Sequence, residues 1–122
     1  MATYSFTDEW RIDGSAEEIY ALLSCPKDYP DWWSDAFLRG EGDSGPAAPG
    51  KRARLLTRGW LPYTLTWELE CIEAVPSSRL DSRIHGDFVG RGLWTITPLD
   101  TGGCSVVLEW NVVVRKPLVR HL

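Results

Sequence analysis

The sequence of 122 residues is poor in residues that cross-link small domains or bind metals: it has three cysteines and two histidines. Cys25, Cys71 and Cys104 are odd in number, widely spaced and without a CxxC pair, which argues against a disulfide framework and a structural zinc site. A chain of this length buries roughly two-thirds of its unfolded surface, so it needs no such links. The sequence therefore predicts one domain, residues 1–122, in a reducing cytoplasm, with no metal and no cofactor motif.

Long apolar runs and an excess of positive charge are also missing. No stretch approaches the ~20 apolar residues that cross a bilayer, and the N-terminus lacks the basic and apolar segments of a leader. The net charge is −4, from 13 basic and 17 acidic side chains. Nucleic-acid binders usually carry a concentrated basic excess. We therefore expect no membrane span and no nucleic-acid partner.

The first third of the chain has a segment with the periodicity of a strand, followed by one with the periodicity of a helix. Residues 4–13 place aromatic and aliphatic side chains at every second position, which predicts a strand. Ser15 with Glu18 forms a capping-box pattern, and apolar residues follow at helical spacing, which predicts a helix over residues 16–24. Pro26 ends this helix, and Asp28 and Pro30 indicate a tight second turn or short helix.

The remainder is typical of an antiparallel meander. A strand over residues 35–42 precedes a loop rich in glycine and proline, and five further strand-like runs cover residues 51–58, 63–75, 78–87, 88–99 and 103–115. Apolar residues alternate with charged ones in several of these runs, as Trp67 does with Glu68 and Ile84 with Arg83. One face of the sheet is therefore apolar, rich in tryptophan and in need of a cover.

Four segments in this order carry a resemblance to a known family: DYPDWW (28–33), RGWLPYTLTW (58–67), GDFVGRGLWTITP (86–98) and CSVVLEWNVVVRKPL (104–118). They resemble the polyketide cyclase/dehydrase branch of the START-like, or SRPBCC, superfamily. The resemblance implies an α+β helix-grip fold: a curved antiparallel sheet of about seven strands, two short helices between the first and second strands, and an apolar cavity. Fatty-acid-binding barrels and NTF2-like cones fit the number and order of strands less well.

The same resemblance implies a long C-terminal helix gripped by the sheet. Residues 116–122 look like its first turn, with Pro117 at a position that suits the start of a helix, so we expect a domain truncated at this point. The apolar face then needs another cover: a second copy of the chain, a bound apolar molecule, or a segment of a longer natural polypeptide. We favour the longer polypeptide.

Seven tryptophans are the most unusual feature, because each buries a large area and supplies one N–H donor. We expect Trp67, Trp94 and Trp110 to share the concave face, with Trp33 and Trp60 nearer its rim. Arg54 is our choice among three arginines on one strand face to pair with a ligand carboxylate or phenolate. The candidate ligand-binding residues are Trp33, Arg54, Tyr63, Trp67, Ile84, Trp94 and Trp110.

Residues suited to catalysis are scarce, and the catalytic residues stay unknown. His85 shares its strand face with charged residues, and Asp87 has the position of a turn residue. No cysteine has a local histidine that would form the thiolate. The favoured function is binding of a small hydrophobic or aromatic ligand, such as a lipid or a polyketide-like metabolite. The alternatives are a polyketide cyclase/dehydrase-type enzyme and a module for protein interaction or assembly, including a homodimer.

Overall fold

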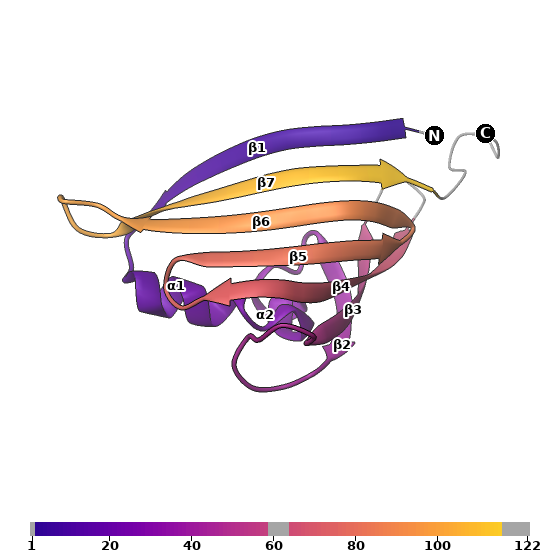
Figure 1. Ribbon diagram of the computed structural model, residues 1–122, viewed down its shortest axis with the longest axis horizontal. Coiled ribbons are helices and arrows are strands. Elements are labelled where there is room, and N and C mark those ends of the chain that lie inside the picture. Colours follow the sequence, from indigo (N-terminus) through magenta and orange to yellow (C-terminus); the bar gives the residue numbers. More distant parts are fainter. Residues whose placement is uncertain (1, 59–63, 116–122) are drawn as a thin grey trace.

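A computed structural model describes residues 2–58 and 64–115 of the chain. It shows one curved antiparallel sheet of seven strands in the order β1-β7-β6-β5-β4-β3-β2, with the helices on one side of it (Figure 1). This is the helix-grip arrangement of sheet and short helices that the sequence predicts. The elements are β1 (Ala2–Ile12), α1 (Ala16–Leu23), η1 (Pro26–Asp28), α2 (Tyr29–Trp32), β2 (Phe37–Gly42), β3 (Arg52–Arg58), β4 (Thr64–Val75), β5 (Arg79–Gly86), β6 (Phe88–Pro98) and β7 (Cys104–Val114).

Helix α1 begins at the predicted capping box. The Ser15 Oγ accepts a hydrogen bond from the Glu18 backbone N–H at 3.1 Å, and the Glu18 side chain reaches back to the N–H of Ser15. The helix buries Ile19 and Leu23 against the sheet. It ends one residue before the predicted end, because Pro26 cannot continue it and starts the 3₁₀ turn η1 instead.

Each strand lies within two residues of its predicted boundaries, because the alternation of side chains persists to the ends of the strands. Two β-bulges interrupt the pairing, one between Phe37 and Arg39 and one between Cys71 and Glu73. The second bulge puts one extra residue into β4, which bends that strand locally. Strand β1 returns to pair along its whole length with β7, so the two ends of the described chain meet in the sheet.

The concave face of the sheet is covered only in part. Under the helices and the loop of residues 43–51, Leu55, Trp67 and Ile84 are at most 4% exposed. On β1 the apolar side chains of the same face are between 36% and 44% exposed, namely Tyr4, Phe6, Trp10 and Ile12. No long C-terminal helix is present among the described residues, and the expected first turn at 116–122 lies outside them.

None of the helices in the described part of the chain is long and apolar enough to cross a membrane.

Candidate ligand-binding cavity

An apolar cavity of about 90 Å³ lies between the covered part of the sheet, the helices and the loop of residues 43–51. Its walls include Trp67 from β4, Ile84 from β5, Trp94 from β6 and Trp110 from β7, while Trp33 closes it from the end of α2. Five of the seven candidate residues named from the sequence therefore meet around one space.

A second cavity of about 300 Å³ adjoins the first. It lies between α1, α2 and the open side of the sheet, and shares Leu23, Trp33 and Trp94 with the first cavity. Trp10 and Trp32 complete its aromatic wall. All six tryptophans of the described residues thus line one cavity or both. A volume of about 300 Å³ is at the lower end of the range for pockets that hold small molecules.

Edge-to-face contacts fix the aromatic walls. The Trp67 ring centroid lies 5.5 Å from that of Trp110 and 5.8 Å from that of Phe88, with the planes nearly perpendicular. Gly92 makes room for this packing, because a Cβ at that position would lie 3.2 Å from Cε3 of Trp110 and 3.3 Å from Cδ1 of Ile84. These rings therefore give one part of the cavity wall a fixed shape.

Two polar groups of the first cavity wall, on Trp67 and Tyr29, already have partners. The Trp67 indole N–H donates to the Thr57 hydroxyl at 2.9 Å, and the Tyr29 hydroxyl donates to the Leu23 carbonyl at 2.5 Å. Burial raises the pKa of the Tyr29 hydroxyl well above its usual range, and a hydrogen bond with Trp94 offsets only part of that effect. Tyr29 is therefore a neutral phenol that joins α2 to α1 and to the sheet.

Arg54 requires a correction. Its neighbours Ala53 and Leu55 face inward and are buried, so Arg54 faces outward and its side chain is 59% exposed. Its guanidinium lies 3.0 Å from Glu68 and 3.9 Å from Glu41 and takes no part in the cavity wall. Strand parity could have shown this, but Leu56 on the outer face made the parity of β3 ambiguous.

Tyr63 and Trp60 lie outside the described residues, so the structure does not place these two candidates.

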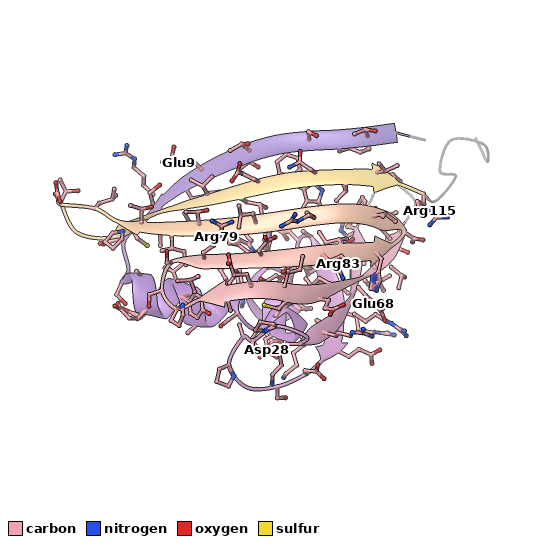
Figure 2. The ribbon with its side chains drawn as sticks, viewed as in Figure 1. Glu9, Asp28, Glu68, Arg79, Arg83 and Arg115 are labelled. Carbon is pink, nitrogen blue, oxygen red and sulfur yellow. The ribbon has the colours of Figure 1, made fainter. Side chains whose placement is uncertain are left out.

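The outer face of the sheet carries a ladder of charged side chains, among them Glu68, Arg79 and Arg83 (Figure 2). His85 belongs to it, with Nε2 at 3.1 Å from Oε2 of Glu68. Asp87 acts as a turn residue: its carboxylate accepts the Thr66 N–H at 2.8 Å, and its own N–H donates to the Thr66 carbonyl. Both groups are therefore used in holding strands together, away from the cavity.

The three thiols are free and poorly suited to nucleophilic chemistry. Burial raises the pKa of the Cys25, Cys71 and Cys104 thiols, and for Cys71 the Asp81 carboxylate adds to the effect. A raised pKa keeps a thiol protonated at neutral pH. Within residues 2–58 and 64–115, no group of three or more histidine, cysteine or acidic residues is placed to hold a metal ion.

Several cavity residues were not singled out from the sequence. Ile19, Leu22 and Leu23 of α1 line the cavities, and their helical spacing was a signal for one buried face. Asp43 and Lys51 reach the first cavity from the loop of residues 43–51. No periodic pattern marks the side chains of such a loop, so nothing in the sequence indicates them.

The curved sheet and the short helices packed on its concave face define a helix-grip fold. The family model described as "Polyketide cyclase / dehydrase and lipid transport" matches residues 3–122, so the chain belongs to that family. This confirms the resemblance noted in the four sequence segments. No functionally curated protein matches the sequence.

Solved structures with this fold include the Zhui aromatase/cyclase from Streptomyces sp. R1128, at a TM-score of 0.75 and 17% identity over 93% of this chain and 70% of that protein. TTHA0849 from Thermus thermophilus matches at 0.78 and 21% identity, over 97% of this chain and 82% of that one. The di-domain aromatase/cyclase BexL from the BE-7585A pathway matches at 0.74 and 20% identity, with 98% of this chain covering 39% of that protein. These likenesses establish the fold.

Proposed function

We propose that this chain binds a small hydrophobic or aromatic molecule, such as a lipid or a polyketide-like metabolite, in the two adjoining cavities. One observation carries the proposal: all six tryptophans of the described residues line these cavities. A tryptophan used only for core packing need not border empty space. Membership of a family whose description includes lipid transport supports the same function.

The physical basis of binding is burial of apolar surface against flat, fixed rings. Each Å² of apolar ligand surface removed from water contributes about 25 cal/mol. Trp67 and Trp110 hold each other edge to face, so little order has to be created when a ligand enters. Flat molecules benefit most, because they can stack on an indole face.

The test combines native mass spectrometry of the purified chain with titration of N-phenyl-1-naphthylamine, a neutral fluorescent probe for apolar cavities. We expect co-purified small molecules or probe binding, and a loss of about tenfold or more in probe affinity in Trp94→Ala, which opens both cavities. A tenfold loss corresponds to about 1.4 kcal/mol, well within the value of one large aromatic side chain.

Two further variants separate binding from folding. Tyr4→Ala removes an aromatic ring from the same face that lines neither cavity, and should leave the affinity unchanged. Ser82→Leu keeps every tryptophan and fills the first cavity, so it should weaken binding without creating a void. Equal affinities in the wild type, Trp94→Ala and Ser82→Leu would reject the cavities as the binding site.

A second candidate is a polyketide cyclase/dehydrase-type reaction in the same cavity, favoured by the family and by the fold of the aromatase/cyclases. Such a reaction needs a positioned acid or base. Tyr63 remains our prediction for a hydroxyl at the mouth. Incubation with a β-hydroxyketone, followed by mass spectrometry for loss of one water, distinguishes turnover from carriage. Turnover that is lost in Tyr63→Phe would favour the enzyme.

A further inference from the structure

The charges of the first cavity lie at one end of it. Three residues of its lining carry a formal charge, Asp43, Lys51 and Arg52, and all three belong to the loop of residues 43–51 or to the first residue of β3. The rest of the lining consists of apolar side chains and a few neutral polar ones. A charged group on a bound molecule would therefore find compensation at this end of the cavity only.

Of these three charged residues, only Arg52 has an oppositely charged partner within 4.0 Å among the described residues. The Asp43 carboxylate accepts the Arg52 backbone N–H at 2.9 Å, and the Arg52 guanidinium lies 3.6 Å from the Glu70 carboxylate. The Lys51 ammonium donates to the Ser44 carbonyl and has no carboxylate within 4.0 Å among the described residues. A neutral carbonyl does not cancel its charge, and an ammonium has three N–H donors, of which this contact uses one.

The backbone around Lys51 is fixed to the sheet. The Lys51 carbonyl accepts the Cys71 N–H at 2.8 Å, its own N–H donates to the Ala48 carbonyl, and the Gly50 N–H donates to the Cys71 carbonyl. The Lys51 ammonium lies beside Gly45, where an added Cβ would be at an ordinary contact distance of 3.4 Å from Nζ. The Lys51 ammonium therefore lies at the solvent-exposed edge of the cavity wall, bonded to the Ser44 carbonyl.

We propose that Lys51 binds the anionic group of the ligand, so that the molecules accepted are apolar acids: a flat or aliphatic body with one carboxylate, phenolate or similar anion. This inference rests on the proposed function and specifies its ligand class. The apolar body lies against the tryptophans, and the anion takes the two remaining N–H donors of Lys51. Lys51 thus has the role that the sequence assigned to Arg54, which the fold turns to the outer face.

Two probes with the same aromatic skeleton test this. 1-Anilinonaphthalene-8-sulfonate is N-phenyl-1-naphthylamine with one added sulfonate, so the pair differs by a single anion. In Lys51→Gln we expect the affinity for the sulfonate probe to fall about tenfold, the size of one charge-assisted hydrogen bond. The affinity for the neutral probe should change less than about twofold. Lys51→Arg keeps the charge and should retain most of the affinity for the anionic probe.

Arg54→Gln is the matched control, because it removes the same charge from the outer face of the sheet and lines neither cavity. It should leave both affinities unchanged. Equal losses for both probes in Lys51→Gln would overturn the inference, because they would show that Lys51 only supports the loop. Unchanged affinity for the anionic probe would overturn it as well. Failure of the wild type to bind either probe would instead reject the proposed function.

Discussion

The concave face of this sheet has one covered and one open region, although both have the same sequence pattern. Under α1, α2 and the loop of residues 43–51, side chains such as Leu55 and Trp67 are buried. On β1, Tyr4 and Phe6 alternate with polar residues just as regularly, yet they are substantially exposed. Alternation therefore shows which side chains share a face, while the elements packed on that face decide which of them are buried.

The two cavities also differ in whether they adjoin the covered or the open region of the sheet. The first has the covered region as its floor and the loop as one wall, and its lining includes Tyr29 and Trp67, whose polar groups are fixed by hydrogen bonds. The second opens toward β1 and is lined by apolar side chains alone. Substitutions on the two sides should therefore differ in their effect on stability, and four of them measure that difference.

The largest effect is expected for Leu55→Ala in the covered region. Leu55 is completely buried in the cluster that includes Trp67 and Ile84, so truncation leaves a void. We expect the free energy of unfolding to fall by about 2–5 kcal/mol. Urea unfolding followed by tryptophan fluorescence measures it. A loss below about 1 kcal/mol would show that the cover is loose enough to collapse into the void.

The next effect concerns the attachment of the cover, that is, of α1, α2 and the loop of residues 43–51. Tyr29→Phe removes the hydrogen bond to the Leu23 carbonyl and leaves that buried acceptor unpaired, at an expected cost of about 1–3 kcal/mol at neutral pH. The pKa of Tyr29 is raised above 10.0 by burial, so the folded state keeps a proton that the unfolded state loses. The stability contributed by Tyr29 is complete below pH 10 and declines as the pH rises above it.

Measurements of the free energy of unfolding from pH 9 to pH 11 check the direction of this pH dependence. The wild type should lose stability faster than Tyr29→Phe above about pH 10, so the gap between them should narrow. All other titratable groups are the same in the two proteins, so their contributions cancel in the difference. A gap that stays constant over this range would show that the Tyr29 hydroxyl titrates normally in the folded protein, and therefore that the cover admits water.

Ser15→Ala tests the start of the cover and should have a smaller effect. It removes the oxygen that accepts the Glu18 N–H at the beginning of α1, at a typical cost of about 1 kcal/mol. Ser34→Ala is the control, since Ser34 is exposed and caps no helix. Thermal unfolding of both variants measures the difference. Equal midpoints would show that packing of Ile19 and Leu23 alone fixes the helix.

Helix α1 and the strands were predictable from the sequence, because they depend on local patterns. The capping box placed α1, and period-two alternation placed the strands within two residues. The inward positions of Trp67, Trp94 and Trp110 followed from the same alternation. Local backbone preference and side-chain parity are properties of neighbouring residues, so a single sequence contains them.

The rest depends on contacts between distant segments. Asp81 lies on the outer face, as its parity predicts, yet it is 5% exposed and bonded to Arg91 from the next strand. Lys51 reaches the cavity only because its loop is bonded to Cys71 on β4. The bulge between Cys71 and Glu73 leaves no pattern in the sequence. These features therefore could not be predicted without knowing which strands pair.

The smallest effect is expected for Tyr4→Thr in the open region. Tyr4 is 40% exposed and lines neither cavity, and threonine keeps the preference for a strand. The free energy of unfolding should change by about 0.5 kcal/mol, as for most surface substitutions. The measurement is made at two protein concentrations differing by about a hundredfold, because any cover supplied by a second copy strengthens with concentration. A loss of several kcal/mol, present only at the higher concentration, would show that the open region is buried between two copies in solution. The contrast between covered and open regions would then hold for the isolated chain alone.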